Sequence, residues 1–415
     1  MPTSSVTPRT LLLPVVIAAA VAACGESNTN TPMGTAGTVT TVAGSSGSGG
    51  SAGSEALAGS AGSSAGSTLG GTGGAAGGSG GAGGAGGGNA MPMLLSETGL
   101  YSNIKTKTLA ADVHPFVPAH TLWSDGAVKN RYAYMPPGGK IITDDMEFWQ
   151  YPAGFKLWKD FTRDGKLIET RLLQKISGGL SDWYMVAFKW NADESDATAL
   201  PMGEANAMGT MHDIPSKEDC KGCHTSMKDN SIGFTAAMLS HNLPNSLNLA
   251  QIDQMGWLTT PAKAGGYPMP GDGPSQAALG YLHANCGMCH NYKSQVYKTK
   301  VTLDLWAHLD KLDTVQNTFA YLSMVCDQWP GDDKFNPKAS CDAGHATGAL
   351  MDTDISKLKR VAPGMSAESG IHDLMALRAT GQAGMMKQMP PLGTEIIDPT
   401  GLGVVDAWIN ALPAQ

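Results

Sequence analysis

Two short segments of the chain repeat one combination of cysteine and histidine. Cys220 to His224 and Cys286 to His290 both have the form C-x-x-C-H. Residues i and i+3 of a helix lie on one face, so the two thiols of each motif can reach the two vinyl groups of one haem. The histidine that follows is then directed at the iron as its proximal ligand. The pattern predicts two covalent haem c groups, attached through Cys220, Cys223, Cys286 and Cys289, with His224 and His290 as axial ligands.

Two other functions fit part of this pattern. Four cysteines in two C-x-x-C pairs can hold a zinc ion, but a zinc site leaves both trailing histidines unexplained. A redox-active dithiol is expected in a βαβ context, which the flanking sequence lacks. Two complete motifs in a chain with only 7 cysteines favour haem.

The second motif has further support downstream. Met389-Pro390-Pro391-Leu392 is followed by an apolar, helix-forming segment at 401–412. This arrangement resembles class I cytochromes c, in which a Met-Pro loop supplies the distal thioether ligand and a terminal helix packs near the haem edge. The resemblance implies that Met389 is the distal ligand of the second haem, with Met385 and Met386 as rivals. It also implies that Arg378 pairs with a haem propionate, against the alternative of a solvated surface charge.

The first motif has no comparably placed distal ligand. His241, Met238 and Met255 follow it on expected helices, and His212 precedes it. Each of these four is more often a structural residue than a ligand, so the distal ligand of the first haem stays open. His283 precedes Cys286 by three residues, and its role is open as well.

Cys326 and Cys341 remain, in a segment rich in Pro, Gly and Asp. In an oxidising compartment such a pair is expected to form a disulfide. Closing that loop contributes roughly 3 kcal/mol in the chain-entropy model. Two free buried thiols are the alternative.

The first residues have the features of an export signal. Arg9 gives a positive start, and Leu11 to Val21 form an apolar run too short to span a bilayer. Val21 to Cys24 resembles a bacterial lipobox, which implies cleavage before Cys24 and lipidation of its thiol. Because Gly25 follows, the resemblance to Gram-negative lipoproteins favours the outer membrane. Ordinary signal cleavage, with Cys24 incidental, is the alternative.

Composition divides the remaining chain. Many of the 53 glycines lie between residues 34 and 90, where Glu55 is the lone charged residue. Such a segment cannot bury enough apolar surface to offset the entropy of ordering. We predict a signal peptide at 1–23, a disordered Gly/Ser/Ala-rich tether at 24–95, a β-rich domain at 96–210 and a di-haem cytochrome c domain at 211–415.

Local patterns predict an α+β fold, with an N-terminal antiparallel β-rich domain followed by a mostly α-helical di-haem cytochrome c domain. Alternating and aromatic residues separated by turn signals predict strands. Apolar residues at helical spacing, separated by Pro and Gly, predict short helices. The expected strands are 130–135, 155–161, 167–176 and 183–190, and the expected helices are 231–242, 249–258, 276–289, 354–359, 369–380 and 401–412.

Taken together, residues 100 to 412 resemble a little-characterised family of bacterial di-haem c-type cytochromes, many of them lipoproteins. The resemblance rests on Leu122 to Ala127, Tyr151 to Gly154, Glu169 to Leu173, Ile214 to Ser216, and Asn285 beside the second motif. It implies a β-rich domain joined to a di-haem cytochrome c domain in the cell envelope. It does not imply a particular redox partner.

Charge and motifs narrow the function. A net charge of −8 without basic runs argues against a nucleic-acid binder. The leading hypothesis is an envelope electron-transfer protein, held to the membrane through Cys24, with an unidentified redox donor and acceptor. The first alternative is a di-haem peroxidase or haem-dependent oxidoreductase with an open first haem. The second is a binding module, whose β domain recruits a dehydrogenase, a carbohydrate or an outer-membrane partner.

Overall fold

The computed structural model describes residues 91–298, 303–326, 360–378, 388–391 and 393–414. The predicted signal peptide, Cys24 and almost all of the tether lie outside these residues, as do Cys341, Met385 and Met386. No helix in the described ranges is long and apolar enough to cross a membrane.

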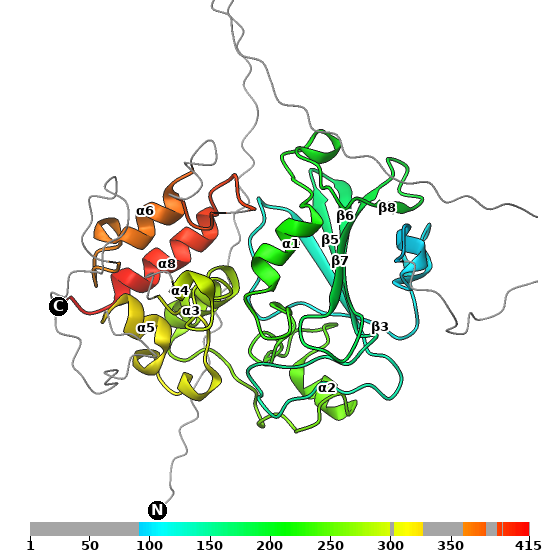
Figure 1. Cartoon of the computed structure of the whole chain (residues 1–415). Coiled ribbons are helices and arrows are strands. Elements are labelled where there is room, and N and C mark those ends of the chain that lie inside the picture. The colour runs from blue at the N-terminus through cyan, green and yellow to red at the C-terminus, as the bar shows by residue number, and fades with distance from the viewer. Residues whose placement is uncertain (1–90, 299–302, 327–359, 379–387, 392, 415) are drawn as a thin grey trace, which may run out of the picture. The chain divides into compact units, whose positions relative to one another are not determined.

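A six-stranded antiparallel sheet forms the N-terminal half (Figure 1). Its strands pair in sequence order, and a separate two-stranded sheet precedes them. The turn between the two central strands holds Asp164 and Gly165 at φ 51° and 73°, the backbone that a tight hairpin requires. The strands are β1 (Tyr101–Asn103), β2 (Thr108–Leu109), β3 (Val113–Pro115), β4 (Val128–Tyr134), β5 (Lys156–Arg163), β6 (Lys166–Lys175), β7 (Trp183–Trp190) and β8 (Ala197–Ala199).

Each face of the sheet has its own hydrophobic core, because successive side chains of a strand point to opposite faces. One face packs Trp158, Leu172 and Phe188 against residues near the start of the sheet. On the other face, a core that includes Leu157 also contains Phe234 from a later segment. That core draws residues from both sides of the boundary predicted at residue 210, and the boundary stays a prediction.

The helices follow the sheet in the chain, so the broad α+β prediction is confirmed. In the helical part, α3 and α8 pack against each other (Figure 1), around a core that includes Leu282 and Trp408. Each begins with an aspartate N-cap followed by proline in the first turn, a strong start signal. The helices are α1 (Lys217–His224), α2 (Leu249–Gln254), α3 (Gly273–Asn285), α4 (Gln295–Lys298), α5 (Phe319–Met324), α6 (Gly370–Ala376) and α8 (Pro399–Ala411).

Four helix predictions need correction. The helices predicted at 249–258 and 369–380 are shorter, because α2 ends at Gln254 and α6 ends at Ala376. Residues 231–242 form bends and a turn at 236–239 instead of a helix, and the side chains from Phe234 to Leu239 are buried. The helix predicted at 276–289 ends at Asn285, so the second motif lies just beyond it. The helix predicted at 354–359 lies outside the described residues.

Candidate haem-attachment sites

The first C-x-x-C-H motif lies on α1, which packs against β7. Ser216 caps this helix: its hydroxyl accepts from the backbone N–H of Asp219 at 3.2 Å, and the Asp219 carboxylate accepts from the N–H of Ser216 at 2.9 Å. This reciprocal cap fixes the start of the helix four residues before Cys220. Cys220 and Cys223 then lie on one face, both half-buried free thiols.

His224 is held in one orientation by the loop that follows α1. Its Nδ1 lies 2.6 Å from the carbonyl oxygen of Asn230, so Nδ1 donates and Nε2 is left as the free lone pair. Burial lowers the pKa of His224 to about 4, which keeps the imidazole neutral. A neutral ring whose second nitrogen is fixed by a carbonyl is the usual arrangement of a metal-binding histidine.

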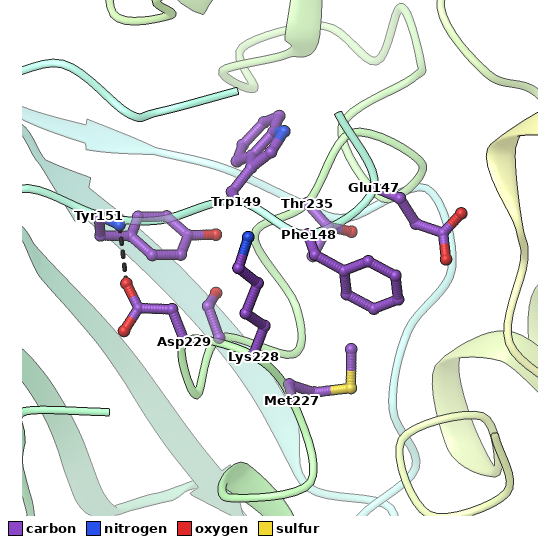
Figure 2. A pocket seen from close by; sticks show the side chains of 9 residues that line it. Glu147, Phe148, Trp149, Tyr151, Met227, Lys228, Asp229 and Thr235 are labelled. Carbon is purple, nitrogen blue, oxygen red and sulfur yellow. Dashed lines mark hydrogen bonds between the residues drawn. The ribbon is translucent and has the colours of Figure 1, made fainter. Parts of the chain in front are cut away.

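The loop after His224 is anchored to the sheet by Asp229. This carboxylate forms a buried ion pair with Lys175 on β6. It also accepts from Trp183 Nε1 at 2.9 Å, and from the backbone N–H groups of Ser181 at 3.1 Å and Tyr151 at 2.8 Å. Figure 2 shows Asp229 beside Tyr151 in a small pocket under this loop. The sheet therefore fixes the residue next to Asn230, which orients His224.

The second motif forms a turn directly after α3. The N–H of His290 donates to the Cys286 carbonyl at 2.9 Å, and the His290 carbonyl accepts from Leu305 at 2.8 Å. A Cβ on Gly287 would lie 2.9 Å from the carbonyl oxygens of both His283 and Leu305. Glycine is therefore required at this position of the motif, because the backbone passes too close for a side chain.

His290 is buried and its Nδ1 has no hydrogen-bond partner among the described residues. Burial lowers its pKa to about 4. A buried neutral imidazole and two free thiols, Cys286 and Cys289, are the groups that attach haem c and bind its iron. The donor sets of both motifs therefore fit haem. Within the described residues, no group of three or more His, Cys, Asp or Glu side chains is arranged to hold a metal ion by itself.

The two motifs lie close to each other. The thiols of Cys223 and Cys289 interact electrostatically, which helps raise the pKa of Cys289 beyond the effect of burial. Met227, three residues after His224, packs with Phe148 and Trp306. Figure 2 shows the Phe148 ring facing the Met227 thioether. The Phe148 and Trp306 rings are stacked, with centroids 6.1 Å apart.

The Met389 loop is tied to neighbouring elements. The N–H of Met389 donates to the Leu374 carbonyl on α6 at 2.9 Å. Further along, the Asp125 carboxylate accepts from the N–H groups of Glu395 at 2.9 Å and Ile396 at 2.8 Å. Met389 itself is half-buried, and its ligation of iron stays a prediction.

The segment 122–127, which carries the family resemblance, connects this loop to the second motif. Trp123 Nε1 donates to the Ile396 carbonyl at 3.1 Å, and the N–H of Trp123 donates to Asn285 Oδ1 at 2.7 Å. Asn285 Nδ2 donates to the Thr121 carbonyl at 3.2 Å. These residues carry the family resemblance, but the sequence alone assigns them no role. The available signal was Asp125-Gly126, a turn pair that adopts φ 47° and 74°.

The distal candidates for the first haem are placed differently from one another. His212 Nε2 lies 2.7 Å from Glu169 Oε1, and its ring packs on Phe161, so this histidine is engaged by the sheet. Met255 is exposed at the end of α2, whereas Met238 is buried. His241 is half-buried and interacts electrostatically with His120.

Three other predicted residues have defined surroundings. Arg378 Nη1 donates to the carbonyls of Met375 at 3.0 Å and Leu377 at 2.6 Å. His283 is buried; its Nδ1 accepts from the N–H of Ala307 at 3.1 Å. Cys326 is buried after α5 and is disulfide-bonded; its predicted partner, Cys341, lies outside the described residues.

A buried cluster of charges, unmarked by any sequence motif, joins the loop between β4 and β5 to the segment that contacts His290. His308 lies 2.8 Å from Glu147 Oε1 through Nδ1 and 3.1 Å from Asp304 through Nε2. Burial lowers the pKa of His308, but its bonds to the two carboxylates outweigh burial and raise the pKa to about 9. At neutral pH this histidine is therefore a buried cation between two carboxylates.

Comparisons with known proteins add no family to this description. No family model matches the chain, and no curated protein or solved structure is significantly similar to it.

Proposed function

We propose that this protein is a di-haem cytochrome c that relays single electrons in the bacterial cell envelope. The observation that carries the proposal is the pair of C-x-x-C-H motifs, each with two free thiols and a histidine whose pKa is lowered to about 4. The proposed architecture is a β-rich domain followed by a mostly α-helical di-haem cytochrome c domain. Lipidation of Cys24 would hold the protein at the membrane, facing a redox donor and acceptor of the envelope.

Each residue has a separate task in this proposal. Cys220 and Cys223 hold the first haem covalently, and Cys286 and Cys289 hold the second. The haems supply one-electron chemistry when bound. His224 is kept neutral and correctly oriented by the Asn230 carbonyl, so its Nε2 is available to iron without a proton having to leave.

The short separation of the two motifs supports a relay. Because the Cys223 and Cys289 thiols interact, groups attached to them would lie close enough for electrons to pass within one chain. Met227, Phe148 and Trp306 form an apolar cluster three residues beyond the first motif. An apolar, rigid environment would keep the reorganisation energy of electron transfer small, which favours a relay.

A pyridine haemochrome assay tests the haem content. We expect two haems per chain that resist denaturation and acid extraction. Cys223→Ala and Cys289→Ala should each lose one haem. Gly222→Ala, which changes a position of the first motif that carries no thiol and where a Cβ would meet nothing within 4 Å, is the matched control and should keep two. One haem or none in the unmodified protein would overturn the proposal.

A haem peroxidase with an open first haem is the second candidate. The first haem has no predicted distal ligand, and the engagement of the candidate His212 by Glu169 supports an open sixth position. Mixing the reduced protein with carbon monoxide and with peroxide separates the two functions. The relay predicts inertness to both. Carbon monoxide binding at one haem, with rapid peroxide-dependent oxidation of an added electron donor, would establish the peroxidase.

A further inference from the structure

Three cationic side chains stand opposite one another across the sheet. Arg131 on β4 is paired in register with Lys159 on β5, and Lys159 is paired with Arg171 on β6. Directly paired residues project from the same face of a sheet, with their Cβ atoms about 5 Å apart. Like charges in this arrangement repel each other and destabilise the sheet. We call these three residues the cationic row.

The described residues supply little negative charge to the cationic row. Arg171 forms a salt bridge with Glu169 at 2.5 Å, but Glu169 is shared with His212. Neither Arg131 nor Lys159 forms a salt bridge with any residue in the described ranges. Arg131 is 7% exposed, and its Nη2 has no hydrogen-bond partner there. An unpaired buried guanidinium nitrogen is costly and calls for an acceptor.

The pKa values of Lys159 and Arg131 also reflect this burial and repulsion. Burial and the charges of Arg131 and Arg171 lower the pKa of Lys159 well below its usual value. Burial lowers the pKa of Arg131 to about 10. Lys129, two residues before Arg131 on β4, adds a fourth positive charge to the same face. An anion at this position would relieve the repulsion among all four.

Two members of the cationic row, Lys159 and Arg171, lie near the first haem-attachment motif. Arg171 interacts electrostatically with the thiols of Cys220 and Cys223. Lys159 interacts with Cys223 and His224. Lys159 and Arg171 also both lie over the Phe161 ring, at 4.9 Å and 4.1 Å from its centroid. The unpaired positive charge and the residues that would hold a haem therefore occupy one region.

We propose that the cationic row binds the two propionate carboxylates of the haem attached at Cys220 and Cys223. The proposal rests on the proposed haem function and adds the groups that orient this haem. Haem carries two carboxylates on the edge opposite its vinyl groups, and arginine binds carboxylates in a bidentate, charge-assisted manner. The row thereby gives the sheet a direct part in the first haem site.

Removing one charge from the row tests the proposal. The variants are Lys159→Met and Arg131→Gln in the full-length, haem-loaded protein. Lys189→Met is the matched control, because Lys189 projects from the same sheet face on β7 but is neutralised by Glu204 at 2.6 Å. The measurements are the haem count, the two midpoint potentials by spectroelectrochemical titration, and the propionate bending modes in resonance Raman spectra.

Positive charge beside a haem stabilises the ferrous state, in which the iron carries one positive charge less. We therefore expect Lys159→Met and Arg131→Gln to lower one of the two midpoint potentials and to shift one set of propionate bending modes. The other haem and the Lys189→Met control should be unchanged. Two attached haems with unaltered potentials and bending modes in both variants would overturn this proposal while leaving the haem function intact. A haem count of zero in the unmodified protein would instead overturn the proposed function.

Two further experiments cover the remaining outcomes: a charge-conserving variant and a titration with phosphate. If Arg131→Gln does not retain the first haem, Arg131→Lys, which keeps the charge, should restore it; failure of that rescue would contradict a charge-based role. An anion from solution could occupy the cationic row in place of the propionates. Inorganic phosphate should leave both potentials of the unmodified protein unchanged, because the propionates already fill the row. A phosphate-dependent shift that disappears in Lys159→Met would show a row open to solvent anions and would overturn propionate binding.

Discussion

Replacing Asp229, in the loop that follows α1, by alanine should strongly destabilise the protein. Asp229 and Lys175 are 2% and 0% exposed, so the variant leaves a buried ammonium without its counter-charge. Breaking a buried ion pair in this way costs about 3–5 kcal/mol. Three donors, on Trp183, Ser181 and Tyr151, also lose their acceptor, and unsatisfied donors add to that cost.

We therefore expect Asp229→Ala to lower the free energy of unfolding by about 4 kcal/mol, or the melting temperature by about 10 °C. Denaturant and thermal unfolding, followed by the haem absorbance and by circular dichroism, measure both quantities. Asp193→Ala is the control, because Asp193 is exposed and bonds only to nearby Ser195. That variant should change the stability by less than about 1 kcal/mol.

A double variant separates the buried charge from the lost packing. If the unpaired ammonium causes most of the cost, adding Lys175→Met to Asp229→Ala should recover part of the stability, because it removes the uncompensated charge. Absence of any recovery, or a loss below about 1 kcal/mol in Asp229→Ala alone, would refute the argument. The first haem should be affected more than the second, since Asp229 adjoins Asn230, whose carbonyl orients His224.

The remaining predictions concern the second haem site. His308 holds its proton more tightly in the folded than in the unfolded protein, so its contribution to stability is complete below pH about 6.5 and is lost as the pH rises through about 9. The free energy of unfolding should therefore fall by up to about 3 kcal/mol across this pH window. His308→Ala should not show this pH-dependent loss. Asp125→Ala should cost about 1–3 kcal/mol and weaken the near-infrared sulfur-to-iron band that Met389→Ala abolishes; an unchanged band in Met389→Ala would assign the ligand elsewhere. Gly287→Ala should reduce incorporation of the second haem, because its Cβ would meet two carbonyl oxygens at 2.9 Å, whereas Gly222→Ala, with nothing within 4 Å, should retain both haems; equal haem counts in the two variants would contradict the packing argument.

Local sequence predicted the elements whose causes are local. The alternating segment at 155–161 and the Asp164-Gly165 turn correspond to β5 and its hairpin, because side-chain alternation and left-handed backbone are properties of neighbouring residues. The first motif lies on a helix as expected, since Ser216 and Asp219 cap it within one turn. These features needed no knowledge of the rest of the chain.

Features that depend on distant residues could not be predicted in this way. The segment 231–242 has helical spacing of apolar residues, but it forms bends and a turn, and its apolar residues pack in a core shared with the sheet. The ion pair of Lys175 and Asp229 joins β6 to a loop beyond α1, and no local sequence pattern in either segment predicts this contact. The cationic row exists only because strand register places Arg131 and Arg171 on either side of Lys159.

These long-range contacts bear on why a β-rich segment precedes the haem motifs. A β-rich segment that only recruited a partner would be attached to the cytochrome segment but would not contribute residues to the haem-attachment sites. Yet Asp229 is fixed by β6 and β7 residues, and the cationic row interacts with Cys220 and Cys223. The sheet thus supplies the anchor of the first motif and the positive charge beside it. We infer that the sheet is part of the first haem site, so that deleting residues 96–210 should remove that haem as well as any partner contact. Retention of two haems in the deleted protein would return the sheet to the role of a separate binding module.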